Sequence, residues 1–127
     1  MKLEQIIELF EQIRLKLIRR FIYIIQVGAN MYLRIAEFTT TSEINFEMLV
    51  SFFETKMIPR NLKAGQLSGE IFRTGPTSGF VISKFHSKSD AEKIMHIMRA
   101  ELIEIQGTTK IKLLEGDRIF SSEGVAY

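Results

Sequence analysis

The sequence predicts an α+β fold in which one helix precedes a βαββαβ unit. Apolar residues recur at steps of three and four in three segments, which is the spacing of a buried helical stripe. Four other stretches are rich in β-branched and aromatic residues, as strands are, and Gly or Pro marks several of the junctions. The 127 residues are enough for one domain with its own core.

The first predicted helix runs from about Lys2 to Ile25 and is amphipathic. Residues 1–30 hold five basic and three acidic side chains, whereas the other 97 residues hold twelve of each. The apolar stripe must be buried by the body of the protein, by a partner chain or by a membrane surface. The three acids dilute the positive charge, which favours packing over a membrane. The stripe comprises Leu3, Ile6, Ile7, Phe10, Ile13, Leu17, Ile18 and Phe21.

The N-terminal segment has neither the order of a secretory signal nor the length of a membrane span. Acids come early, the basic cluster is central, and the apolar run "FIYIIQV" is far shorter than the roughly 20 residues that cross a bilayer. We therefore expect an intracellular, cytoplasmic protein.

The remaining elements follow in order from Met31. "YLRIAEFTT" predicts a strand, and the stripe from Phe46 to Met57 predicts a helix with Asn45 as its N-cap and Pro59 at its end or kink. "LSGEIFRT" and "GFVISKFHS" predict two strands joined by the turn "GPTS". A capping box of Ser89 and Glu92 predicts the start of the third helix, and "TKIKLLEG" predicts the last strand before the tail "DRIFSSEGVAY".

This order predicts a ferredoxin-like βαββαβ plait, a four-stranded antiparallel sheet with two helices on one face. We assign residues 1–30 to an N-terminal amphipathic extension and residues 31–127 to the plait. Strand alternation places Leu33 and Ile35 on one face of the first strand and Ala36 and Phe38 on the other. Both faces are apolar, but two helices cover only one. We therefore expect a homodimer or higher homo-oligomer in which the second face packs against another copy.

Two stretches, "RIAEF" and "GFVISKFHSKSDAEKIM", give residues from about Met31 to Phe120 a resemblance to the dimeric α/β-barrel superfamily. The chain is most similar to its antibiotic-biosynthesis-monooxygenase type. The resemblance implies a homodimer whose two sheets close into a barrel. Members include cofactor-independent oxygenases, isomerases, haem-degrading enzymes and proteins with no known activity.

The haem-degrading members are similar to one another in an Asn on the first strand, a Trp near the end of the third strand and a His on the next helix. In this sequence Glu37 or Phe38 stands where the Asn would be, and Phe85 replaces the Trp. His96 alone could match. The resemblance therefore implies a barrel without the usual haem-degrading set.

For acid–base chemistry, which needs a titratable group in a dry pocket, the first candidate is Glu37, followed by His86 and His96. A strand carboxylate more often pairs with a cation such as Arg34 or Lys84. His96 lies roughly 140° around its helix from the buried stripe, so we expect it to face solvent or a neighbouring chain.

For contact with an apolar ligand the candidates are Phe38, Phe80 and Phe85. The sequence has no cysteine and no His or carboxylate spacing of a metal site, so we expect neither a metal nor a cofactor.

Three function classes remain open. The first is a module that binds or transforms a small hydrophobic molecule in a cavity between sheet and helices, with a cofactor-independent monooxygenase-like or isomerase-like activity if it is an enzyme. The second is an assembly protein whose N-terminal helix recruits partners. The third is an RRM-like binder of single-stranded RNA, since "SGFVISKF" resembles the third-strand motif of that domain. Ser78 replaces the basic residue of the motif, and the neutral body argues against nucleic acid.

Overall fold

The computed structural model describes residues 2–29 and 31–124, with side chains of the first helix described as far as residue 20. The chain divides into two compact units, Met1–Asn30 and Met31–Tyr127. The first unit is the helix α1, Leu3–Ala29, which extends four residues beyond the predicted end at Ile25. Within the described ranges no helix has both the length and the apolarity needed to cross a bilayer.

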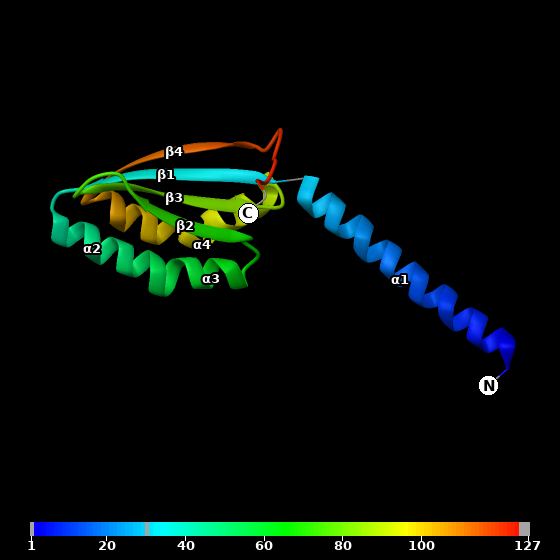
Figure 1. The fold of residues 1–127 in the computed structure, drawn as a ribbon. Coiled ribbons are helices and arrows are strands. Elements are labelled where there is room, and N and C mark those ends of the chain that lie inside the picture. Colours follow the sequence, from blue (N-terminus) through cyan, green and yellow to red (C-terminus); the bar gives the residue numbers. More distant parts are fainter. Residues whose placement is uncertain (1, 30, 125–127) are drawn as a thin grey trace. The chain divides into compact units, whose positions relative to one another are not determined.

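The second unit is a sheet covered by helices on one face (Figure 1). Its strands are β1 (Tyr32–Thr40), β2 (Ser68–Arg73), β3 (Ser78–Phe85) and β4 (Thr109–Asp117). They form one sheet in the order β2-β3-β1-β4, and each neighbouring pair is antiparallel. The predicted α+β class and βαββαβ order are confirmed.

The first crossover between strands is one helical stretch with a π-helical turn in its middle. It consists of α2 (Glu43–Phe52), the π-helical η1 (Phe53–Met57) and α3 (Ile58–Lys63). The Ile58 N–H donates to the carbonyl of Phe53, five residues back. Pro59 follows directly; it has no N–H to donate, and its ring would crowd the carbonyl four residues before it. Pro59 therefore coincides with a wider turn, and the helix continues to Lys63.

Both predicted N-caps were wrong. Ser42, not Asn45, caps α2, because its hydroxyl accepts the N–H of Asn45 at 3.1 Å. Ser87, not Ser89, caps the last helix, α4 (Lys88–Gln106), because its hydroxyl accepts the N–H of Asp90 at 3.2 Å. Ser89 lies inside α4 and is exposed.

The alternation of the strands separates a helix face from an open face. The helix face carries the core, in which the Phe38 ring stacks on Phe46 and meets Phe53 edge to face, both with centroids 5.4 Å apart. The pairing register places Leu33, Ile35 and Glu37 on the opposite, open face. The same face receives Phe72, Phe80, Ile82, Lys84, Lys112 and Leu114.

Candidate functional site

A small apolar cavity lies between the helices and the helix face of the sheet. Ala36 and Phe38 of β1 and Val81, Ser83 and Phe85 of β3 line one side of it. The other side is lined from η1 by Phe53 and Met57, and from α4 by Ile94, Met95, Met98, Leu102 and Ile105. The volume is about 40 Å³, close to the space of one water molecule.

Three of the residues that line the cavity are methionines, Met57, Met95 and Met98. Methionine has three rotatable side-chain bonds and adapts its shape to irregular space. Leu113 of β4 also lines the cavity and is 43% exposed, so the cavity approaches the surface at the β4 edge. The π-helical turn stands directly over the cavity, and such turns are common at functional sites.

Polar side chains cross the helix face beside this cavity; we call Gln66, Ser83, Arg34 and Glu115 the polar row. Arg34 pairs in register with Ser83 on β3 and with Glu115 on β4. Gln66 stands just before β2, and Gln66, Ser83 and Arg34 all line the cavity. The row therefore gives an apolar pocket one polar border.

Arg34 is fixed from several sides and is only 7% exposed. Its Nε donates to Oε1 of Glu115, and its Nη1 donates to the carbonyl of Ala91 at 3.1 Å. The guanidinium carbon lies 5.5 Å from the centre of the Phe85 ring. A buried cation held by a carboxylate, a carbonyl and a ring face is a rigid positive group at the edge of the cavity.

Tyr32 completes this cluster. Its hydroxyl donates to Oε2 of Glu115 at 3.2 Å, so Glu115 accepts from both Tyr32 and Arg34. Burial raises the pKa of Tyr32 above its usual 10.0, and the negative charge of Glu115 raises it further. Tyr32 therefore stays a neutral donor at physiological pH.

Gln66 is buried with one half of its amide unsatisfied. The side chain is 5% exposed, and its Nε2 donates to the carbonyl of Ser68 at 2.9 Å. Its Oε1 is buried and has no hydrogen-bond donor within the described part of the chain. Gly69 makes room for this amide, since a Cβ there would lie 3.1 Å from Nε2 of Gln66 and 2.9 Å from Cγ2 of Ile58.

Two of the three predicted ligand-contacting residues lie at the cavity. Phe38 and Phe85 line it, and both are buried. Phe80 lies on the open face, where its ring stacks on Phe72 with centroids 5.0 Å apart. Phe80 cannot contact a molecule in this cavity unless the strand is rearranged.

The structure places the three predicted acid–base residues away from the cavity lining. Glu37 is exposed on the open face, between Phe80 and Lys112 in the pairing register. His86 follows β3 directly, and its Nδ1 is buried without a hydrogen-bond partner in the described residues. His96 is exposed on α4, as its angle around the helix indicates. These side chains lie apart because alternation turns Glu37 away from the helices and the helical period turns His96 away from the sheet.

The sequence interpretation missed the polar row as a site. Strand alternation puts Arg34 on the same face as Ala36 and Phe38, and Ser83 on the same face as Val81 and Phe85. The sequence could therefore have predicted that both polar side chains face the helices. Gln66 lies in the segment between α3 and β2, where no periodic pattern distinguishes a buried amide from an exposed one.

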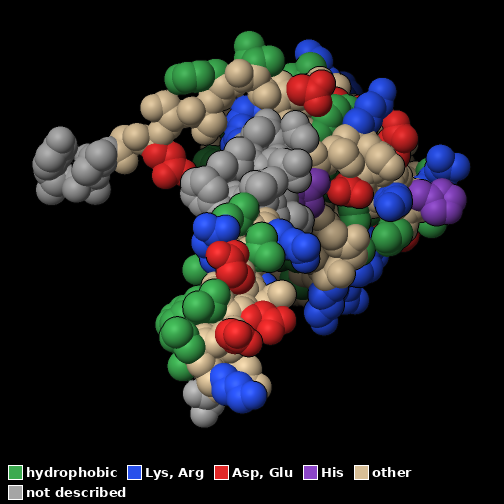
Figure 2. Space-filling model, turned by 90° about the vertical axis from the view of Figure 1, so that its right-hand side faces the viewer, with side chains coloured by type: hydrophobic (Ala, Val, Ile, Leu, Met, Phe, Trp, Pro, Cys, Tyr) green, Lys and Arg blue, Asp and Glu red, His purple; other side chains and the backbone are tan. Residues whose placement is uncertain are grey.

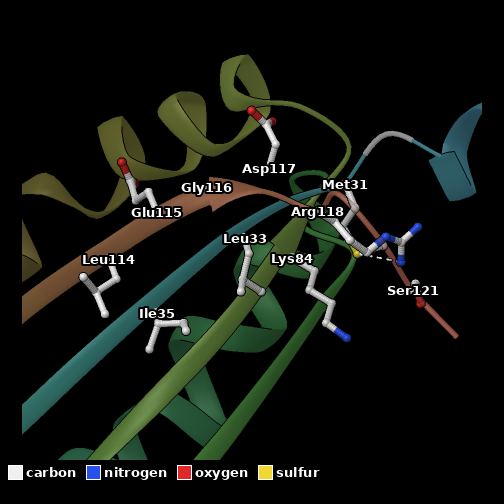
Figure 3. Close-up of a pocket in the computed structure, with 10 residues that line it drawn as sticks. All are labelled: Met31, Leu33, Ile35, Lys84, Leu114, Glu115, Gly116, Asp117, Arg118 and Ser121. Carbon is white, nitrogen blue, oxygen red and sulfur yellow. Dashed lines mark hydrogen bonds between the residues drawn. The ribbon is translucent and has the colours of Figure 1, made fainter. Parts of the chain in front are cut away.

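A second, larger hollow of about 420 Å³ lies on the open face (Figure 3). Leu33, Ile35 and Leu114 from adjacent strands line it, together with the segment after β4. That segment is held to the start of β1 because the Arg118 N–H donates to the carbonyl of Met31 at 2.8 Å. In Figure 3 the side chains of Glu115 and Asp117 point away from those of Leu33 and Ile35, as strand alternation requires.

Neither the charges on the face drawn in Figure 2 nor the acidic side chains of the described residues mark another site. Figure 2 shows basic and acidic side chains interspersed on one face of the molecule. In residues 2–29 and 31–124 there is no group of three or more His, Asp or Glu side chains placed to hold a metal ion.

No protein-family model and no curated protein matches this chain. Solved structures do. A dimeric ferredoxin-like protein from an uncultured marine organism has a TM-score of 0.62 and 10% identity, covering 72% of this chain and 98% of that one. A protein from Nitrosomonas europaea, proposed to be an antibiotic biosynthesis monooxygenase, has a TM-score of 0.62 and 11% identity, covering 75% and 96%.

SnoaB, a cofactor-independent oxygenase from Streptomyces nogalater, has a TM-score of 0.57 and 10% identity, covering 76% of this chain and 97% of its own. At such identities the similarity establishes the fold, and it confirms the fold that the sequence resemblance predicted. The chain has the fold of the dimeric ferredoxin-like and antibiotic-biosynthesis-monooxygenase-like proteins.

Proposed function

We propose that this protein is a homodimer that binds a small hydrophobic molecule between its sheet and its helices. The observation that supports binding most directly is the apolar cavity beneath η1 and α4, bordered by the polar row. Small-molecule sites in proteins have this composition: mostly apolar walls and a few polar groups that orient the ligand. At about 40 Å³ the cavity is much smaller than such sites, so binding requires the lining side chains to move apart.

The homodimer is supported by the composition of the open face. Leu33, Ile35, Phe80 and Ile82 form its centre, and Phe72 and Leu114 are 41% and 48% exposed. Soluble monomers rarely leave a sheet-sized apolar surface in water, and a second copy offers the same surface in return. Two of the similar solved structures are of proteins described as dimeric.

Binding is favoured over catalysis by the chemistry of the lining. Arg34 is the one ionisable side chain among the residues that line the cavity, and it is already held by Glu115 and Ala91. General acid–base catalysis needs a group that gains and loses a proton near neutral pH, which a guanidinium does not do. If the protein is an enzyme, a cofactor-independent monooxygenase-like or isomerase-like reaction is the candidate, since SnoaB shares the fold.

Native mass spectrometry of protein purified from cells tests this proposal. We expect a dimer that releases a small molecule when collisionally activated. Ala36→Leu fills the cavity and should abolish the retained mass, whereas Ala100→Leu, on the exposed face of α4, should not. A dimer of bare protein mass would contradict ligand binding, and it would instead favour an assembly role for the N-terminal helix.

Single-stranded RNA binding is a second candidate because Phe72 and Phe80 form a stacked pair on the open face. Aromatic rings on an open sheet are the platform on which such proteins stack bases. This function requires the face that the homodimer covers, so the two proposals exclude each other. A salt-dependent mobility shift with oligouridine that Phe80→Ala abolishes would establish it.

A further inference from the structure

We propose that Gln66 selects the ligand of the cavity by accepting one hydrogen bond from it. This inference rests on the proposed function and goes further, because it names the ligand class: small, mostly apolar molecules that carry a hydroxyl or N–H group at one end.

The orientation of the Gln66 amide follows from its contacts. Nε2 donates to the carbonyl of Ser68 at 2.9 Å, and an amide turned over would set two acceptor oxygens against each other. The backbone on either side is also held: the Gln66 N–H donates to the carbonyl of Asn61 at 3.0 Å, and the Leu67 N–H donates to the carbonyl of Lys84 at 2.8 Å. Oε1 is therefore fixed as an acceptor.

Burial makes this acceptor selective. The side chain is 5% exposed, and Oε1 has no donor among residues 31–124. A buried carbonyl oxygen without a partner costs free energy that a donor on the ligand recovers and an apolar isostere cannot. Sites built around such a group reject analogues that lack the hydrogen bond.

The surroundings support an occupant that is apolar apart from this group. Together with Gln66, the lining residues include Met57, Phe85 and Met98, which offer no strong hydrogen bond. A water molecule needs two to four polar partners to be held in such a place. Ser83 and Arg34 stand further along the polar row, so the polar contacts of a ligand gather at one border of the cavity.

The test compares phenol with fluorobenzene, two probes of similar size of which only phenol donates a hydrogen bond. Both are larger than the cavity of about 40 Å³, so the flexible side chains of Met57, Met95 and Met98 must shift to admit either one. Titrations of the full chain, followed by nuclear magnetic resonance, give both dissociation constants. We expect phenol to bind about tenfold more tightly than fluorobenzene. In Gln66→Met, which replaces the amide by an apolar chain of similar length, the ratio should fall to about one. Gln106→Met, at the exposed end of α4, is the matched control and should keep the wild-type ratio.

The outcomes separate this inference from the proposed function. Equal affinity of the two probes for the wild-type protein overturns the role of Gln66 and leaves cavity binding intact. Binding of neither probe overturns both. The wild-type ratio alone decides between these outcomes, so the test stands even if Gln66→Met fails to fold.

Discussion

Single residues at the border of the cavity stabilise one another through shared partners. Glu115 accepts hydrogen bonds from Arg34 and Tyr32, and Arg34 also donates to the carbonyl of Ala91 on α4. The cluster links β1, β4 and α4 by polar contacts at the edge of an apolar core. Removing the Glu115 carboxylate would leave Arg34 and Tyr32, which are both buried, without this partner, and such a loss costs more than the intact contact contributes.

Tyr32 gives this cluster a pH dependence. Its folded pKa is raised, so its contribution to stability is complete below pH 10.0 and is lost as pH rises through the folded pKa. We expect the unfolding free energy of the wild-type protein to fall, relative to Tyr32→Phe, above pH 10.0. Urea unfolding between neutral and alkaline pH measures this difference. Parallel pH profiles for the two proteins would show that Tyr32 ionises as freely in the folded as in the unfolded chain.

Such residues can be predicted from the sequence where their burial is determined by their neighbours along the chain. Phe38 and Phe85 lie at the cavity because strand alternation fixes their face, and the sequence carries that alternation. Gln66 could not be predicted, because its burial depends on the end of α3, on the pairing of Leu67 with Lys84 and on the missing side chain at Gly69. Those three conditions come from different elements and meet only in the fold.

Among the elements, the helix starts show where local signals become ambiguous. Ser87 and Ser89 are both followed three residues later by an acid, Asp90 and Glu92, so each fits an N-cap. Pairing decides between them: Phe85 still pairs with Tyr32 in the sheet, and the chain turns into α4 immediately afterwards. The order and type of the elements followed from periodicity, but their first residues required the strand register.

The cap assignment can be measured. Ser87→Ala removes the hydroxyl that accepts the Asp90 N–H, and we expect it to destabilise the protein by about 1 kcal/mol. Ser89→Ala, inside α4 and exposed, is the matched control and should change stability by less than about 0.5 kcal/mol. Urea unfolding of both variants gives the two values. The reverse ranking would return the cap to Ser89.

On the scale of the whole molecule, we propose a different role for each face of the sheet. The helix face holds the core and the cavity, and the open face holds the surface for a second copy. The sequence predicted this division because both residue sets of β1 and β3 are apolar while only two helical stretches are available to cover them. The small size of the cavity could not be predicted, since it depends on how Phe38, Phe53 and Phe85 pack.

Assembly can be tested independently of binding. Ile35→Lys places a charge at the centre of the open face, and we expect it to convert a dimer into a monomer of 14.7 kDa. Ile97→Lys, on the exposed side of α4, should leave the dimer intact. Sedimentation equilibrium gives both masses. If Ile35→Lys keeps twice the chain mass, the open faces do not form the interface.

The alternation of β1 has a consequence for insertions and deletions. Neighbours along this strand serve opposite sides, since Arg34 stands beside the cavity and Ile35 faces outward. Removing one residue upstream of them would exchange the two roles, bringing the guanidinium out and the aliphatic chain in. A shift of the β1 register by one residue would therefore disrupt the cavity and the proposed dimer surface together. Only the loss or gain of an even number of residues would keep each remaining side chain of β1 on its present face of the sheet.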